Sequence, residues 1–184
     1  MIGKALLALF VVFTIALFAL PYIAPFEFEQ ETIVNEVFDS NTVGMFFFTD
    51  FSCSYCRETA DILATSQVQY VIRHFPQQPS SYQKAYMYEC SKQFGLEPEF
   101  RNALYTRTVS QMFEEFNLDQ REFTHCMESQ SVRLQVERDV FHARALELAG
   151  TPSTVFVNTN TLELDILTGV KSQSVYESYF AKYS

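Results

Sequence analysis

The chain has 184 residues, 48% of them hydrophobic, and its 22 acidic and 13 basic residues give a net charge of −9 at pH 7. This length suits one globular domain with an appendage, and the apolar content is sufficient for a sizeable core. The acidic balance argues against nucleic acid as a partner, because binding to phosphates requires clustered Lys and Arg side chains.

An uncharged stretch from residue 5 to residue 24 follows Lys4. At about 1.5 Å per residue it would form a helix about 30 Å long, which matches the hydrocarbon core of a membrane. Lys4 is the only charge before this stretch, and by the positive-inside rule it keeps the N-terminus in the cytoplasm. The rest of the chain would then lie outside the cytoplasm.

The competing interpretation is a cleaved signal peptide, in which Pro21 ends a short apolar region. We assign residues 1–25 to a membrane anchor or signal segment, and residues 26–41 to a linker with a short amphipathic helix over Glu31–Asp39. In both interpretations residues 42–184 form a domain on the periplasmic or extracellular side. That domain is membrane-anchored in the first interpretation and secreted in the second.

The next segment, Val43–Phe51, is apolar on both faces, as expected of a central strand that helices cover on both sides. A helical pattern follows over Ser54–Ser66. The motif Cys53-Ser54-Tyr55-Cys56 lies where the strand gives way to the helix. A strand, a C-x-x-C motif and a helix in this order predict a redox-active dithiol.

The spacing of the two cysteines suits thiol–disulfide chemistry. In the first turn of a helix one thiol faces solvent while the other lies behind it, close enough to form a bridge and to resolve a mixed disulfide. We therefore predict Cys53 as the attacking sulfur, stabilised as a thiolate by the helix N-terminus, and Cys56 as the resolving one. Ser54 and Tyr55 form the active-site loop. There Tyr55 either adjusts the leaving-group quality of Cys53 or only contacts substrate or solvent.

Haem attachment and zinc binding use the same cysteine spacing. Haem attachment requires His directly after the second cysteine, where this chain has Arg57. A zinc site requires a second ligand pair, and the adjacent His125 and Cys126 direct their side chains apart. The sequence therefore predicts no metal and no organic cofactor.

The second predicted strand, Val68–Phe75, ends at Pro76, and strand, helix and strand form a right-handed crossover. From about residue 80 to residue 149 the pattern is helical, and strands return only afterwards. The elements predicted for this part are helices Tyr82–Phe94, Glu99–Arg107, Val109–Phe116, Asp119–Met127 and Ser131–Ala149 with Gly150 as its stop, strands Thr154–Asn158 and Leu162–Leu167 joined by a turn at Thr159-Asn160, and helix Ser172–Lys182.

Two further cysteines, Cys90 and Cys126, fall in this helical part. In an oxidising compartment they are expected to form a structural disulfide. A disulfide between them would close a loop of about 36 residues, which would stabilise the domain by about 4 kcal/mol in the chain-entropy model. The alternative is two separate buried thiols that behave as small hydrophobic side chains.

Several other polar side chains are predicted to be structural. His74, near the end of the second strand, is expected to satisfy backbone groups or face solvent, and His142, on the long helix, to lie on the surface. The tyrosines at 82, 86 and 88 are expected to pack between helices rather than to bind a cofactor.

A Thr-Pro pair, Thr151-Pro152, precedes a β-branched strand, which is where a cis proline can be held. Together with Phe48–Cys56 and Arg73–Pro76, this motif resembles the DsbA-like branch of thioredoxin-fold thiol–disulfide oxidoreductases, from about Thr42 to the C-terminus. The resemblance implies an α/β thioredoxin fold with a helical insertion at about residues 80–149. It also implies a cis Thr151–Pro152 bond packed against the dithiol, with backbone groups that pair with an extended substrate.

The function implied is exchange of disulfides with unfolded or cysteine-containing polypeptides, with reoxidation by a membrane redox partner. The same resemblance leaves a reductase or isomerase open, and a peptide-holding chaperone or assembly module is the non-catalytic alternative. One position departs from the family. A buried acid is expected six residues before the first cysteine, where this chain has Phe47. Proton transfer would then depend on water, on Glu58 or on the substrate, because Asp50 is expected to cap or turn the loop.

Overall fold

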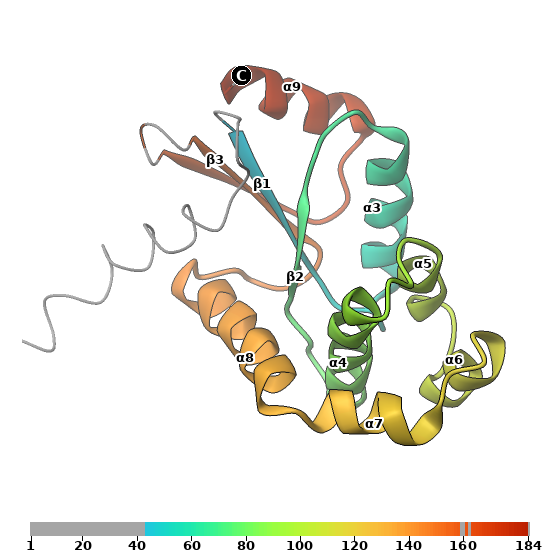
Figure 1. The fold of residues 1–184 in the computed structure, drawn as a ribbon. Helices are drawn as coiled ribbons and strands as arrows, with labels where there is room; N and C mark the ends of the chain where they lie inside the picture. The colour runs from blue at the N-terminus through green and yellow to red at the C-terminus, as the bar shows by residue number, and fades with distance from the viewer. Residues whose placement is uncertain (1–42, 159–160, 162, 184) are drawn as a thin grey trace, which may run out of the picture. The chain divides into compact units, whose positions relative to one another are not determined.

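The computed structural model describes residues 43–158, 161 and 163–183 (Figure 1). The predicted membrane segment, the linker helix and the turn at residues 159 and 160 lie outside the described residues. Among those that are described, no helix is long and apolar enough to cross a membrane.

A four-stranded sheet in the order β2-β1-β3-β4 forms the centre of the domain. β1 pairs with β2 in parallel, whereas the β1–β3 and β3–β4 pairs are antiparallel. This arrangement confirms the predicted thioredoxin-like α/β fold. The strands are β1 Val43–Thr49, β2 Val71–His74, β3 Ser153–Asn158 and β4 Leu164–Thr168.

Helices cover both faces of the sheet (Figure 1). α3, Ser54–Thr65, connects β1 to β2, and it contacts the C-terminal helix α9, Gln173–Tyr183, on one face. α8, Gln130–Ala145, lies against β2 on the other face. The side chains of β1 alternate between the two faces, as strand geometry requires. Each residue from Met45 to Phe48 is at most 1% exposed, so the strand is buried on both sides, as its sequence predicts.

Five helices follow one another between β2 and β3. Their apolar side chains, among them Phe100, Leu104, Met112 and Phe123, join the same core cluster as Phe47. The five helices are α4 Pro79–Gln93, α5 Glu99–Leu104, α6 Val109–Glu115, α7 Gln120–Glu128 and α8.

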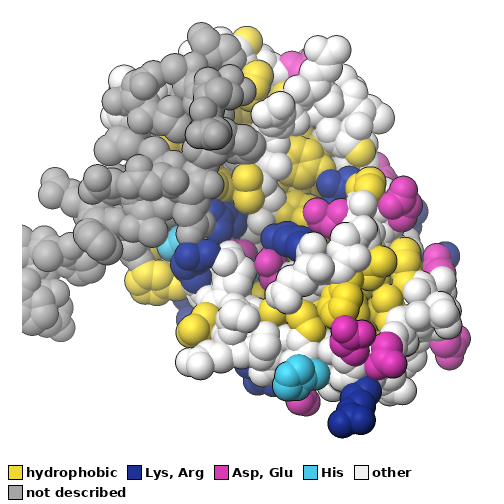
Figure 2. All heavy atoms as spheres, viewed as in Figure 1, with side chains coloured by type: hydrophobic (Ala, Val, Ile, Leu, Met, Phe, Trp, Pro, Cys, Tyr) yellow, Lys and Arg dark blue, Asp and Glu magenta, His cyan; other side chains and the backbone are white. Residues whose placement is uncertain are grey.

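On the face viewed in Figure 2, Lys and Arg side chains of the described residues are interspersed with Asp and Glu.

Four predicted boundaries are wrong by three or four residues. β2 begins at Val71 and not at Val68, and α5 ends at Leu104 and not at Arg107. α4 begins at Pro79 and not at Tyr82, because proline at the first helical position lacks only an N–H that would have no partner there. α8 ends at Ala145 and not at Ala149. Glu147, with φ of 54°, adopts the left-handed conformation that terminates the helix, so Gly150 is not its stop.

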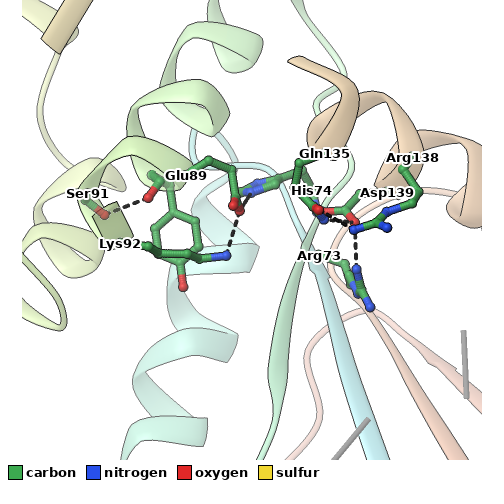
Figure 3. A network of polar contacts seen from close by, with 9 residues as sticks. Arg73, His74, Glu89, Ser91, Lys92, Gln135, Arg138 and Asp139 are labelled. Atoms are coloured by element: carbon green, nitrogen blue, oxygen red, sulfur yellow. Dashed lines mark hydrogen bonds and ion pairs between the residues drawn. The ribbon is translucent and has the colours of Figure 1, made fainter. Parts of the chain in front are cut away.

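A buried polar network connects β2 with α4 and α8 (Figure 3). Arg73 Nη1 lies 3.0 Å from Asp139 Oδ1, and the backbone N–H of His74 donates to Asp139 Oδ2 at 2.9 Å. On the other face of β2, His74 Nε2 lies 2.7 Å from Glu89 Oε1, and Lys92 Nζ donates to the same oxygen. Both faces of the strand are therefore fixed to helices by charged groups.

Candidate active site

The two cysteines of the C-x-x-C motif lie at the N-terminus of α3. Cys53 is the N-cap residue, and its Sγ accepts the backbone N–H of Cys56 at 3.4 Å. Both are free thiols, Cys53 partly exposed and Cys56 0% exposed. One sulfur is therefore accessible to a second molecule while its neighbour lies behind it.

The environment of Cys56 favours its protonated form. Burial raises the pKa of this thiol to about 12, although hydrogen bonds from the Asp50 backbone and the Thr151 side chain lower it. The desolvation of a thiolate at this place outweighs these hydrogen bonds. Cys56 therefore carries its proton in the reduced protein at neutral pH.

Asp50 shapes the turn that leads into the dithiol. Its carboxylate accepts the backbone N–H of Ser52 at 2.7 Å and that of Gln77 at 2.9 Å, and its carbonyl accepts the N–H of Cys53 at 3.0 Å. The prediction that Asp50 turns this loop is confirmed. Lys84 Nζ contacts the same turn by donating to the carbonyl oxygen of Phe51 at 3.1 Å.

The loop before β3 forms the opposite wall of the site. The Thr151–Pro152 peptide bond is cis, and the thiol of Cys53 donates to the carbonyl oxygen of Thr151 at 3.7 Å. The N–H of Gly169 donates to the carbonyl oxygen of Pro152 at 2.8 Å. Gly169 has φ of 78°, a conformation that glycine adopts without steric cost.

A largely apolar hollow of about 430 Å³ lies beside this wall. Tyr55, which is 63% exposed, borders it on the dithiol side. An exposed aromatic side chain next to an accessible sulfur offers contact area to an extended polypeptide. The other lining residues are Ala149, Gly150, Thr151, Pro152, Thr168, Gly169 and Val170.

A family model described as thioredoxin matches residues 40–166, more than half of the chain. The chain belongs to the thioredoxin family. No curated protein sequence matches this thioredoxin-family protein.

Solved structures show which thioredoxin-like fold the protein has. It is similar to a thioredoxin-like oxidoreductase from Silicibacter pomeroyi DSS-3, with 24% identity, 76% of this chain and 85% of that chain covered, and a TM-score of 0.66. It is also similar to the thiol–disulfide exchange protein α-DsbA2 from Wolbachia pipientis, with 13% identity, 84% and 96% covered, and a TM-score of 0.68. It is similar as well to Pseudomonas aeruginosa DsbA2, with 18% identity, 78% of this chain and 89% of that chain covered, and a TM-score of 0.63. The resemblance to the DsbA-like fold is confirmed.

Other side chains singled out in the sequence lie away from the dithiol or serve structure. Phe47 is fully buried, and Glu58 is exposed on α3. His74 is fully buried and paired with Glu89, so it neither faces solvent nor pairs through its ring with the backbone. His142 is 3% exposed, and the prediction that it lies on the surface is wrong.

The helical part contains the second cysteine pair. Cys90 on α4 and Cys126 on α7 form a disulfide whose Cα atoms are 6.0 Å apart. Cys126 is therefore not available to a metal ion. The described residues contain no group of three or more His, Cys, Asp or Glu side chains that could hold one.

Three polar side chains near the site have no counterpart among the predicted residues. Tyr105 donates to or accepts from Thr49 at 2.8 Å between the hydroxyl oxygens, and Lys84 contacts both Phe51 and Leu104. Thr49 immediately precedes Asp50 and could have been singled out as the last polar position of the strand. Tyr105 carries no such local signal.

Proposed function

We propose that this thioredoxin-family protein is an extracytoplasmic thiol–disulfide oxidoreductase that exchanges disulfides with secreted or membrane polypeptides. The observation that carries the proposal is the partly exposed Cys53 at the start of α3, backed by the buried Cys56 and facing the cis-proline loop. An exchanging protein needs one accessible sulfur and one that only its neighbour can reach.

The reaction begins with the oxidised form, in which Cys53 and Cys56 are bridged. A substrate thiolate attacks Sγ of Cys53, the S–S bond breaks, and its electron pair moves to Sγ of Cys56. The second substrate thiolate then attacks the substrate sulfur of the mixed disulfide and releases Cys53 as a thiolate. The substrate leaves with a new disulfide, and the protein carries the two electrons.

The substrate class is extended, cysteine-containing polypeptide. The carbonyl oxygen of Thr151 faces Cys53, and the apolar hollow beside it is bordered by Tyr55. A chain that lies along this loop could pair with its backbone and place an apolar side chain in the hollow. By resemblance to the DsbA-like family, a membrane redox partner would reoxidise the dithiol, and no metal or organic cofactor takes part.

The proposed location of the site outside the cytoplasm rests on the N-terminal sequence, and the disulfide between Cys90 and Cys126 supports it. The proposed organisation is an anchor or signal segment at 1–25, a linker at 26–41 and the catalytic domain at 42–184. The mass of the protein isolated from membranes and from the extracytoplasmic fraction distinguishes anchor from signal. A mature chain that starts between residues 20 and 30 would remove the anchor.

Two activity assays test the function. The protein should accelerate both the reduction of insulin by dithiothreitol and the refolding of a reduced, scrambled substrate, and Cys53→Ser should abolish both. If the protein prevents aggregation of unfolded chains equally well with and without Cys53, it is a peptide-holding module instead.

A redox titration against glutathione gives the direction of exchange. A potential near −120 mV identifies an oxidant, and one near −270 mV identifies a reductant. If the protein is a reductant, the proposed direction of exchange is wrong, but the exchange chemistry of Cys53 and Cys56 stands.

A further inference from the structure

The active-site turn consists of residues Asp50 to Cys53 and ends at the attacking sulfur. The backbone N–H of Cys53 donates to the carbonyl oxygen of Asp50 at 3.0 Å, which is the hydrogen bond that closes a β-turn. The central peptide of this turn joins Phe51 to Ser52. Its orientation determines how the backbone enters Cys53, the N-cap residue of α3.

Two charged side chains hold this central peptide, one at each end. The N–H of Ser52 donates to Oδ1 of Asp50 at 2.7 Å, and the carbonyl oxygen of Phe51 accepts from Nζ of Lys84 at 3.1 Å. Hydrogen bonds with one charged partner are roughly twice as strong as neutral ones. The peptide can flip only if it breaks both bonds, and its oxygen would then point towards the Asp50 carboxylate.

Each of the two charged groups is also anchored outside the turn. The other carboxylate oxygen of Asp50, Oδ2, accepts the N–H of Gln77 at 2.9 Å in the segment after β2. Nζ of Lys84 donates to the carbonyl oxygen of Leu104, the last residue of α5, at 2.7 Å. Neither group can therefore follow the peptide freely. Because Lys84 belongs to α4, the helical part of the chain takes part in shaping the turn.

The ring of Phe51 secures the turn independently of Lys84. This side chain is 1% exposed, and its ring centroid lies 4.8 Å from that of Tyr105 and 5.3 Å from that of Tyr88. These contacts do not involve the Lys84 ammonium group. If the lysine is replaced, we therefore expect the turn to remain folded and only its central peptide to be released.

The exact position of Cys53 matters most for a molecule that contacts a second part of the site. Sγ of Cys53 lies 3.7 Å from the carbonyl oxygen of Thr151. A polypeptide that reacts at this sulfur must lie along the Thr151–Pro152 loop at the same time, whereas a small reagent contacts the sulfur alone. A displacement of the sulfur should therefore slow the polypeptide selectively, because orientation contributes to rate where two groups must be aligned together.

We propose that Lys84 is a positioning residue that, together with Asp50, holds the Phe51–Ser52 peptide and so aligns Sγ of Cys53 with the Thr151 loop for polypeptide substrates. We call the two hydrogen bonds to this peptide the peptide lock. The inference rests on the proposed function and deepens it, because it names a residue outside the dithiol and the loop that lets the site favour a polypeptide over a small disulfide.

The kinetic test uses the reduced full chain and two disulfides with the same leaving group. One is a short peptide whose cysteine carries a 2-thiopyridyl group, and the other is N-acetylcysteine with that group. Sγ of Cys53 attacks the cysteine sulfur of either reagent, the S–S bond breaks, and its electron pair leaves on 2-thiopyridone, whose absorbance gives the rate. Lys84→Met should slow the peptide reaction about tenfold, out of the roughly hundredfold that a misplacement of about 1 Å can cost, and the N-acetylcysteine reaction by less than about twofold.

Hydrogen exchange of the Ser52 amide measures the peptide lock without any substrate. In the wild type, opening of the central peptide breaks its bonds to both Asp50 and Lys84, whereas in Lys84→Met only the first bond has to break. The Ser52 amide, followed by NMR, should therefore exchange about tenfold faster in Lys84→Met, since a hydrogen bond to a charged group contributes at least about that factor.

Three further variants serve as controls. Lys84→Arg keeps a charged donor and should restore both the rate with the peptide and the protection of the Ser52 amide. Lys92→Met removes the other lysine of α4, which pairs with Glu89 at 2.7 Å, and should leave the ratio of the two rates unchanged. If Lys84→Met fails to fold, Lys84→Gln, whose side chain is shorter and uncharged, takes its place.

An equal loss of both rates in Lys84→Met, or no loss of either, would overturn the positioning role of Lys84. Unchanged exchange at Ser52 would overturn the peptide lock itself. If the wild type reacts with the N-acetylcysteine reagent but with no polypeptide, the proposed function fails, and faster exchange at Ser52 in Lys84→Met would still support the peptide lock.

Discussion

The thiol of Cys53 lies 3.7 Å from the carbonyl oxygen of Thr151, although 98 residues separate them in the chain. The contact joins the first turn of α3 to the loop before β3, the two segments that border the site. Any molecule bound covalently to Cys53 must therefore lie next to the cis-proline loop. Because Cys53 is accessible and Cys56 is buried, the two sulfurs should differ in their reaction with alkylating reagents and with substrate polypeptides.

Alkylation at neutral pH should distinguish the two sulfurs. Iodoacetamide should modify Cys56→Ser at one site in the native state and leave Cys53→Ser unmodified. Burial is the largest cause of the raised pKa of Cys56 and remains in Cys53→Ser, so the reactive thiolate form of Cys56 stays scarce at pH 7. Mass spectrometry of the native proteins measures the labelling, and the same reaction in denaturant provides the control. Rapid labelling of Cys56 in folded Cys53→Ser would contradict the assignment of roles.

The same variants predict the trapped intermediate. Cys56→Ser should accumulate mixed disulfides with substrate polypeptides, because no second sulfur in the protein can displace what Cys53 has captured. Cys53→Ser should form none. Non-reducing gels of both variants, mixed with an oxidised polypeptide, make the comparison.

The disulfide between Cys90 and Cys126 should contribute to stability and not to catalysis. It joins residues 36 apart in sequence, so its removal in a Cys90→Ala, Cys126→Ala variant should lower the free energy of unfolding by about 4 kcal/mol in the chain-entropy model. Urea unfolding measures the loss. The folded fraction of the variant should keep the wild-type rate of insulin reduction, and a slower reaction per folded molecule would show that the bridge also positions the site.

The buried ion pair of Arg73 and Asp139 predicts a large effect of one mutation. Asp139→Ala leaves the Arg73 guanidinium, 4% exposed, without this carboxylate and also removes the acceptor of the His74 N–H. The free energy of unfolding should fall by about 3 to 5 kcal/mol, as for other broken buried pairs. Guanidinium chloride unfolding measures it. The exposed pair of Arg57 and Asp61 is the matched control, and Asp61→Ala should change stability by less than about 1 kcal/mol.

The parts of the fold that sequence predicts are those with local signals. The strand before the motif is apolar on both faces, and the helix after it begins at the cysteine itself, so neither depends on distant residues. For the end of α8, the sequence pattern predicts a position four residues too late. Leu146, Glu147 and Leu148 favour helix, but the chain must turn there to enter β3, and this tertiary requirement overrides their propensity.

The contacts that sequence could not predict join residues far apart in the chain. Thr49 and Tyr105 are separated by 56 residues, and nothing near Tyr105 indicates that its hydroxyl reaches β1. The sequence predicts that His142 lies on the surface and that His74 either satisfies backbone groups or faces solvent, whereas both side chains are buried. His74 is buried because Glu89 on α4 supplies a charged partner for its ring, and α4 packs on β2 only in the folded chain.

The pairing of Glu89 with His74 predicts how stability depends on acid. Burial alone would raise the pKa of Glu89, but hydrogen bonds and charges from His74 and Lys92 outweigh it and lower the pKa from 4.5 to about 2. A carboxyl group with a lowered folded pKa stabilises the native state above its unfolded pKa, and this contribution disappears as the pH falls through the folded value. The free energy of unfolding should therefore fall between pH 4.5 and pH 2, by about 3 kcal/mol from this group.

Urea unfolding at a series of pH values measures this slope. Glu89→Gln should be less stable than the wild type at pH 7 and should show a flatter dependence below pH 4.5, because the group that titrates there is gone. Glu115→Gln is the matched control. Its carboxylate pairs with Arg107 at 2.7 Å, but both side chains are more than 40% exposed, so solvent screens the pair and the acid slope should remain that of the wild type. Equal slopes for the wild type and Glu89→Gln would show that the buried pair does not control the response to acid.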